Sequence, residues 1–121
     1  MYRENRLRKN EEFQEVFKKG KSIANRQFVV YFMEKKDQDS FRVGVSVSKK
    51  MGNAVTRNRI RRYIKEAIRA RTDEMKPSYD VIVICRLPAV ELEYAEFRDS
   101  LYHCLRKAKL FTTSKKQGNI S

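Results

Sequence analysis

Asp80-Val81-Ile82-Val83-Ile84-Cys85-Arg86 is the stretch that decides the fold, because every residue between its two charged ends is apolar. Most of these residues are β-branched, which favours an extended strand. A strand that is apolar on both faces is typical of the interior of a sheet that is covered on both sides. We therefore predict a central strand over residues 80–86, with Cys85 as a buried, reduced thiol.

Two further strands are predicted upstream of this one. Residues 27–34 are rich in β-branched and aromatic side chains, and residues 41–48 alternate between apolar and polar ones. Because a short charged loop, residues 35–40, joins the two strands, we expect them to pair antiparallel. The stretch at residues 21–26 is polar and is predicted to be irregular.

Three helices complete the predicted fold: residues 10–18, a helix that begins between residues 53 and 57 and ends near residue 72, and residues 91–110. The residues of the last helix that should face inward are Leu92, Ala95, Leu101, Leu105 and Ala108. The order α-β-β-α-β-α predicts an α/β (α+β) fold, a two-layer sandwich in which helices pack on a small mixed sheet.

The chain is predicted to form a single domain over residues 1–121. A chain of 121 residues can bury one core and is too short for two ordinary domains. We expect an ordered core over about residues 6–110. The polar and basic tail, residues 111–121, is predicted to be disordered.

The charge is the strongest compositional signal. Twenty-eight Lys and Arg against fifteen Asp and Glu give a formal net charge of +13 and a pI near 10.0. Such a field attracts polyanions, so nucleic acid is the leading partner and an anionic membrane the second. Apolar stretches of the roughly 18 residues needed for a spanning helix are missing, and so is a secretory signal at the N-terminus. We expect a cytoplasmic protein with no membrane partner.

Nine of the cations, and the single acid Glu66, lie between Lys49 and Arg71. On a helix, the apolar residues of this segment form one stripe, namely Ile60, Tyr63, Ile64, Ala67 and Ile68. The adjoining face carries Arg61, Arg62, Lys65 and Arg69, with Arg57 at its edge. An ordinary solvated face alternates in sign, and like charges at i, i+4 destabilise a helix. An uncompensated row of cations therefore favours polyanion binding over a merely solvated face.

Aromatic residues allow two interpretations. Phe13, Phe17 and Tyr31 could form a surface on which unpaired bases stack, with Ser46 beside it on the open face of a strand. Alternatively, Phe13 and Phe17 anchor the first helix to the core, which the residues alone favour because apolar side chains at helical spacing are usually core.

The sequence lacks the usual catalytic constellations. His103 is the single histidine, so a pair of histidines for acid–base cleavage of RNA is missing. The acids show no cluster with the spacing of a two-metal site, and there is no Gly-rich phosphate loop. We therefore expect no catalytic residue and no metal site on the polypeptide itself.

Three segments resemble the bacterial ribonuclease P protein family: Ser22-Ile23-Ala24-Asn25-Arg26-Gln27-Phe28-Val29-Val30-Tyr31, Arg42-Val43-Gly44-Val45-Ser46-Val47-Ser48-Lys49-Lys50 and Gly52-Asn53-Ala54-Val55-Thr56-Arg57-Asn58-Arg59-Ile60-Arg61-Arg62. The likeness covers about residues 6–109, and the Lys-Lys-x-Gly-x-Ala-Val-x-Arg-Asn block is highly specific. Thr56 departs from the family, which often has Lys there.

The resemblance implies a subunit of the endoribonuclease ribonuclease P, which removes the 5′ leader from precursor tRNA. The implied catalyst is ribonuclease P RNA, which holds Mg²⁺, while the protein binds this RNA and the leader. The resemblance also implies an uncommon left-handed crossover that joins parallel strands through the basic helix, where the usual hand is right. The protein alone is expected to be a monomer.

The resemblance also implies roles for individual residues. Those against the catalytic RNA are Arg57, Asn58, Arg59, Arg61, Arg62 and Lys65. Lys49 and Lys50, in the motif before this helix, are also expected to bind RNA. A cleft for the leader is implied at Phe13, Phe17, Tyr31 and Ser46, so the two phenylalanines would serve both packing and binding.

Without the resemblance, the residues leave other functions open. A general RNA-binding module would bind many structured RNAs without conferring cleavage. A DNA-binding protein would place the basic helix in a major groove and would be expected to dimerise. A self-sufficient nuclease lacks its acid–base pair, and membrane binding would need the apolar side of the basic helix, which the core requires.

Overall fold

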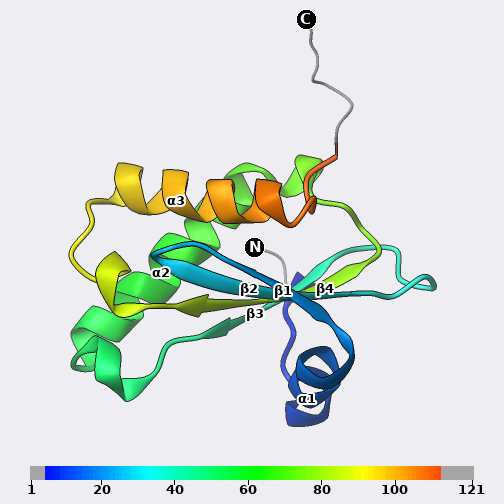
Figure 1. The fold of residues 1–121 in the computed structure, drawn as a ribbon, viewed down its shortest axis with the longest axis horizontal. Helices are drawn as coiled ribbons and strands as arrows, with labels where there is room; N and C mark the ends of the chain where they lie inside the picture. Colours follow the sequence, from blue (N-terminus) through cyan, green and yellow to red (C-terminus); the bar gives the residue numbers. More distant parts are fainter. Residues whose placement is uncertain (1–4, 113–121) are drawn as a thin grey trace, which may run out of the picture.

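The computed structural model describes residues 5–112 and shows a four-stranded sheet with helices on both faces (Figure 1). The strands are β1 (Lys21–Ala24), β2 (Phe28–Glu34), β3 (Arg42–Ser46) and β4 (Tyr79–Cys85). The α-helices are α1 (Asn10–Lys19), α2 (Ala54–Ala70) and α3 (Tyr94–Lys107), and the short 3-10 helices are η2 (Lys49–Met51), η3 (Thr72–Glu74) and η4 (Leu87–Ala89). The predicted small mixed sheet with packed helices is confirmed.

β4 lies in the interior of the sheet, whose strand order is β1-β2-β4-β3. It pairs antiparallel with β2 and parallel with β3. Val81 and Val83 belong to the larger of two hydrophobic cores, whereas Ile82 belongs to a smaller one. The strand that is apolar on both faces is therefore buried on both, as predicted.

The predicted antiparallel pairing of the strands at residues 27–34 and 41–48 is wrong, because β4 lies between β2 and β3. Placing the wholly apolar strand in the interior removes the most apolar surface from water. β3 takes the edge, where its polar residues Arg42 and Ser46 stay partly exposed.

β1 occupies a stretch that the sequence predicts to be irregular. It pairs antiparallel with β2, with Ser22 opposite Tyr31. Most of its side chains are exposed, so a hydrophobic pattern cannot reveal it. Backbone hydrogen bonds to the edge of β2 hold this strand, and the element order becomes α-β-β-β-α-β-α.

α2 and α3 cover one face of the sheet, and α1 lies on the opposite face (Figure 1). Buried residues that α2 and α3 contribute to the larger core include Ile60, Ile64, Phe97, Leu101 and Leu105. Within the described residues, the buried members of the smaller core beneath α1 are Leu7, Val16 and Ile82. The parallel neighbours β3 and β4 are joined through α2, which is the crossover for which the resemblance implies a left-handed sense.

Local signals set the start of α2 and the apolar stripe of α3. The Asn53 side chain caps α2 by accepting a hydrogen bond from the Thr56 N–H at 2.9 Å. α3 begins later than predicted, and its stripe runs from Phe97 through Leu101. The predicted inward position of Ala95 is wrong, since that residue lies off the stripe and is exposed.

Phe111 is part of the described fold, although the sequence predicts that the disordered tail begins there. Its side chain is only 8% exposed, and it forms an isolated β-bridge with Met75. Burial of the ring from water accounts for order beyond Leu110. The rest of the predicted tail, residues 113–121, lies outside the described residues.

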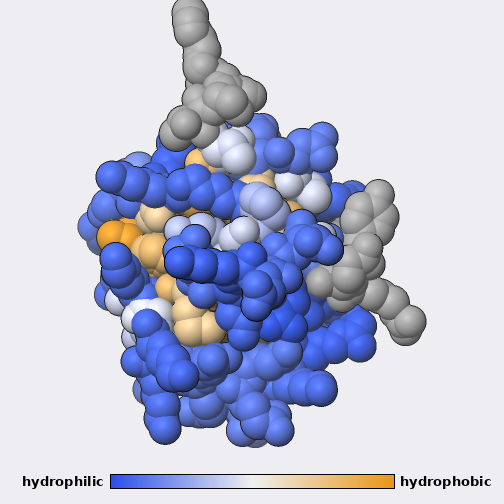
Figure 2. Space-filling view, turned by 90° about the vertical axis from the view of Figure 1, so that its right-hand side faces the viewer, coloured by the Kyte–Doolittle hydropathy of each residue, from blue (hydrophilic) through white to orange (hydrophobic). Residues whose placement is uncertain are grey.

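Polar and charged side chains cover most of the molecular face drawn in Figure 2, and hydrophobic side chains show between them. A hydrophilic surface is expected almost everywhere on a chain with a formal net charge of +13. A binding site must therefore be located from the arrangement of cations and aromatic rings. No helix within residues 5–112 is long and apolar enough to cross a membrane.

Candidate nucleic-acid interface

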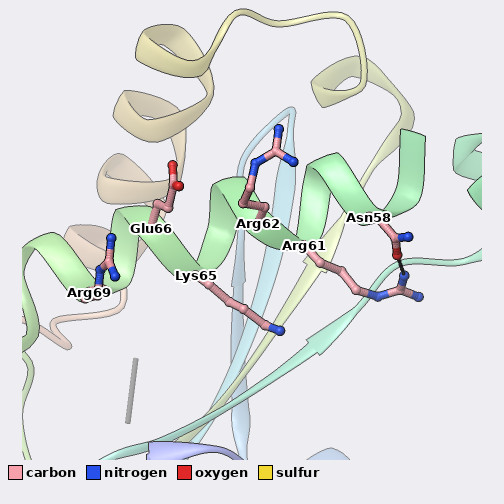
Figure 3. A pocket seen from close by; sticks show the side chains of 6 residues that line it. All are labelled: Asn58, Arg61, Arg62, Lys65, Glu66 and Arg69. Atoms are coloured by element: carbon pink, nitrogen blue, oxygen red, sulfur yellow. Dashed lines mark hydrogen bonds between the residues drawn. The ribbon is translucent and has the colours of Figure 1, made fainter. Parts of the chain in front are cut away.

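The exposed face of α2 carries a cluster of cations. Ile60, Ile64 and Ile68 are buried against the sheet, as the predicted stripe requires. The opposite side forms a hollow lined by Asn58, Arg61, Arg62, Lys65, Glu66 and Arg69 (Figure 3). Arg61 and Lys65 point from α2 away from α3, toward the side on which β3 lies (Figure 3). We call these two residues the cation pair.

Arg57, Asn58 and Arg59, which the resemblance places against the catalytic RNA, point in different directions. Residues two positions apart on a helix are rotated by about 200°. Arg57 accordingly donates from Nε to the Gly52 carbonyl at 3.1 Å, whereas Arg59 donates from Nη2 to the Val90 carbonyl at 2.8 Å. The Asn58 amide oxygen accepts a hydrogen bond from Arg61 Nη1 at 3.0 Å (Figure 3). Asn58 therefore belongs with the cation pair, while Arg59 faces the loop before α3.

Lys49 and Lys50 form η2, immediately before α2, and both are exposed. Met51 anchors this short helix because its side chain is buried. Gly52 follows with a φ of 139°, in a region that L side chains rarely adopt. The turn therefore holds two more cations beside the first turn of α2.

Three aromatic rings meet between α1 and the sheet. The Phe13 and Phe17 centroids lie 6.5 Å apart, and the Phe17 ring meets the Tyr31 ring edge-on at 4.9 Å. Phe17 is 37% exposed, so part of its ring is available to a ligand. We call Phe13, Phe17 and Tyr31 the aromatic cluster.

Phe13 lies against the backbone of β3 at Gly44. A Cβ atom added at Gly44 would lie 2.4 Å from Phe13 Cζ, well inside van der Waals contact. Glycine is therefore needed there to let the ring rest on the strand. Phe13 is half-buried and packs beside the smaller core, so both the packing role and the surface role predicted for it are compatible with its position.

The sheet register places Ser46 next to the aromatic cluster. Tyr31, Ile82 and Gly44 form one row across β2, β4 and β3. The next row on the same face comprises Val29, Ile84 and Ser46. α1 covers the first row, whereas all three residues of the second row stay partly exposed. We call this second row the open row.

These three sets are related through the edge strand β3. The aromatic cluster borders the open row on the face that α1 partly covers. The open row ends at Ser46 on the edge strand β3, and the cation pair points away from α3, toward the side of α2 on which β3 lies (Figure 3). The aromatic cluster therefore borders a partly exposed sheet surface, and the cation pair points toward the edge strand at which that surface ends.

The protein family described as Ribonuclease P matches residues 1–109 of the chain. The chain belongs to the ribonuclease P protein family. Members of this family are protein components of ribonuclease P, and membership gives the chain a part in tRNA processing by a ribonucleoprotein.

Individual relatives support the membership over nearly the whole chain. The ribonuclease P protein component of Bacillus pumilus is 50% identical over 119 residues, which cover 98% of this chain and 100% of that protein. Its counterpart in Geobacillus sp. (strain WCH70) is 51% identical over 108 residues, covering 89% of this chain and 93% of that one.

Solved structures of ribonuclease P proteins also share the fold. The Staphylococcus aureus protein is 47% identical with a TM-score of 0.85, and the match covers 89% of this chain and 98% of that one. The Thermotoga maritima protein is 31% identical with a TM-score of 0.77, covering 84% of this chain and 96% of that one.

Within residues 5–112, no group of three or more His, Cys, Asp and Glu side chains is placed to hold a metal ion. Cys85 is free and buried, and burial raises the pKa of its thiol to about 11. The exposed His103 ring lies 3.3 Å from the Asn25 amide nitrogen, at the turn between β1 and β2 and away from the aromatic cluster. That the RNA holds the Mg²⁺ stays a prediction.

A second hollow lies at the C-terminal ends of α2 and α3 in this ribonuclease P protein. It is lined by Arg71, Glu74, Lys76, Arg106, Lys109, Phe111 and Thr112. The Arg71 guanidinium lies 4.4 Å from the Tyr102 ring centroid and 5.4 Å from that of Phe111. Cations at helix C-termini offset the exposed carbonyl dipoles, so we assign this group a structural role.

Sequence reasoning missed one set of interacting residues in this family member: Glu12, Arg42 and Asp80. Arg42 donates to both Asp80 carboxylate oxygens, at 3.0 and 2.8 Å, and to Glu12 at 2.6 Å. The sequence holds a faint signal for this set. Asp80 is an isolated acid at the start of an apolar strand, and such a group needs a partner when it is buried.

Proposed function

We propose that this protein is the RNA-binding subunit of ribonuclease P and that it binds the 5′ leader of precursor tRNA beside the catalytic RNA. The observation that carries the proposal is the joint placement of the aromatic cluster, the open row and the cation pair. Tyr31 stands in the row next to Ile84 and Ser46, with Phe17 edge-on against it. Arg61 and Lys65 point toward the side of α2 on which the edge strand of Ser46 lies.

The chemistry of a leader fits such a surface. A leader is single-stranded and varies in sequence, so a protein must bind it through backbone charge and base stacking. Aromatic rings accept any base because every base has a π-face. The partly exposed ring of Phe17 and the cations of α2 supply these two kinds of contact.

We further propose that the remaining cations of η2 and α2 bind the catalytic RNA and that this RNA, with its Mg²⁺, carries out the cleavage. Lys49, Lys50, Arg57 and Arg62 are candidates, since they lie outside the cation pair on the same part of the chain. Arg59 contributes by tying α2 to the loop before α3. The free protein is expected to be a monomer, which sedimentation equilibrium would test.

Multiple-turnover cleavage of a 5′-extended precursor tRNA in moderate Mg²⁺ tests the proposal. Three reactions are needed: bacterial ribonuclease P RNA alone, this protein alone, and both together. We expect cleavage at the mature 5′ end to appear, or to accelerate, only when both are present. Unchanged activity of the RNA on adding the protein would leave a general RNA-binding module as the better description.

A further inference from the structure

α1 carries two of the three proposed stacking rings and packs on the smaller of the two hydrophobic cores. Among residues 5–112, the buried members of this core are Leu7, Val16 and Ile82, and the core is separate from the larger one. Partly buried hydrophobic residues pack against it, namely Phe13, Tyr31, Met33 and Ile84. Apolar contact is non-directional, so a small core fixes the position of a helix only loosely. Additional contacts must set the place of the Phe13 and Phe17 rings.

Arg42 and Asp80 provide a rigid base for such a contact. They stand directly opposite each other in the parallel pair of β3 and β4. The Asp80 side chain is 1% exposed, and Arg42 holds it with a two-pronged pair of hydrogen bonds at 3.0 and 2.8 Å. This planar arrangement fixes the guanidinium orientation. The hydrogen bond to Asp80 raises the pKa of Arg42 above its ordinary value, although burial opposes this.

The remaining guanidinium nitrogen of Arg42, Nη1, contacts a residue of α1. Arg42 Nη1 donates to Glu12 Oε2 at 2.6 Å. The other Glu12 oxygen accepts the Lys9 N–H at 3.1 Å and closes the capping box of α1. Burial alone would raise the pKa of Glu12, but the hydrogen bonds from Lys9 and Arg42 lower it overall. Glu12 is therefore a charged link between the sheet and the first turn of α1.

This link adjoins the aromatic cluster. Phe13 follows Glu12 in the chain, and its ring rests on Gly44, which is two residues from Arg42 on the same side of β3. Phe17 lies one helical turn further along α1. A shift of the first turn of α1 would therefore move both rings relative to Tyr31.

Net stability is a poor explanation for an ion pair in this position. The desolvation of partly buried charges offsets much of their attraction, and apolar side chains would hold a helix as well. A guanidinium held by two hydrogen bonds to one carboxylate has a fixed direction, so it can fix the orientation of the helix that it contacts, whereas apolar packing cannot.

We propose that Arg42 is a positioning residue for leader binding, which sets the Phe13 and Phe17 rings by joining Asp80 of the sheet to Glu12 of α1. The inference rests on the proposed function and assigns the leader-binding surface a support that does not touch the leader.

Glu12→Gln is the sharpest test. The amide oxygen can still accept the Lys9 N–H, and the side-chain volume is nearly unchanged, so the helix cap is retained. Arg42→Ala is less suitable because it leaves the buried Asp80 charge unpaired and endangers folding. Glu11→Gln is the matched control, since Glu11 is an exposed acid in the same helical turn and loses the same charge.

The assay compares holoenzymes assembled with each variant by their affinity for precursor tRNA and for mature tRNA. We expect Glu12→Gln to lower the preference for the precursor by about tenfold, a coupling of about 1.4 kcal/mol. Affinity for the catalytic RNA should be unchanged, and Glu11→Gln should behave as wild type. An equal loss for precursor, mature tRNA and catalytic RNA would show a merely structural role and overturn the inference.

Two further measurements separate this inference from the proposed function. Nuclear Overhauser contacts between the Phe17 and Tyr31 rings of the free protein should weaken in Glu12→Gln, and intact contacts would overturn the inference. In a double-mutant cycle, Phe17→Ala should add little to the effect of Glu12→Gln, whereas full additivity would contradict an action through the rings. If the wild-type holoenzyme shows no preference for precursor, the proposed function itself fails.

Discussion

Phe17→Ala tests the leader-binding surface with little risk to the fold. The ring is 37% exposed and meets Tyr31 edge-on at 4.9 Å, so it lies at the surface of the aromatic cluster. Removal of a fully buried Phe costs about 3–5 kcal/mol, and this partly exposed ring should cost considerably less. The variant should therefore remain folded.

The effect on binding follows from stacking. Loss of a base–aromatic stack costs about 1–3 kcal/mol, and each 1.4 kcal/mol is about tenfold in affinity. We expect the affinity of the holoenzyme for a leader-bearing precursor to fall by roughly 5- to 150-fold. Mature tRNA has no leader, so its affinity should not change.

The affinities for leader-bearing precursor and for mature tRNA are measured by equilibrium titration with wild-type, Phe17→Ala and Phe17→Leu holoenzymes. Leu keeps the apolar contact with the cluster but has no π-face, so Phe17→Leu separates stacking from packing. The reasoning would be refuted by an equal loss for precursor and mature tRNA, or by full leader affinity in Phe17→Leu.

Four further predictions concern the supporting residues. Gly44→Ala should displace the Phe13 ring, since the new Cβ would lie 2.4 Å from Cζ, and should lower the free energy of unfolding by about 1–3 kcal/mol in denaturant titrations. Lys65→Ala should reduce the slope of log affinity against log salt by about 0.7–0.9 if it contacts a phosphate, and an unchanged slope would argue against that contact. Arg59→Ala should cost about 1 kcal/mol of stability by removing its hydrogen bond to the loop before α3, and should weaken assembly with the catalytic RNA in gel-shift titrations. The interactions that lower the pKa of Glu12 contribute stability that is fully present above the ordinary value of 4.5 and is lost as the pH falls through the lowered value. Denaturant titrations from neutral to acid pH should therefore show a smaller loss of stability in Glu12→Gln than in wild type.

Local patterns in the sequence predict those elements whose structure is set by nearby residues. The apolar run at residues 81–85 predicts the interior strand, because burial on both faces requires it. The 3.6-residue period predicts the buried stripe of α2, and Asn53 predicts its start. The cations and rings of the candidate interface are visible for the same reason, since each is a feature of one helix or strand.

Features that depend on distant pairings are not predictable in this way. The position of β4 between β2 and β3 depends on which arrangement buries the most apolar surface, which no single segment records. β1 is held by backbone pairing and has no hydrophobic pattern. The set of Glu12, Arg42 and Asp80 comes from three elements, so only the fold brings its charges together.

The central claim, that the leader lies across the open row, is tested most directly by site-specific crosslinking. Ser46→Cys would carry a photoreactive group, and Cys85 and Cys104 should not react because both thiols are buried with raised pKa values. Lys36→Cys, on the exposed loop between β2 and β3, is the control position. We predict that the holoenzyme labelled at residue 46 crosslinks to leader nucleotides of precursor tRNA and that the control does not. Crosslinks from residue 46 to the catalytic RNA alone, with none to the leader, would contradict the account.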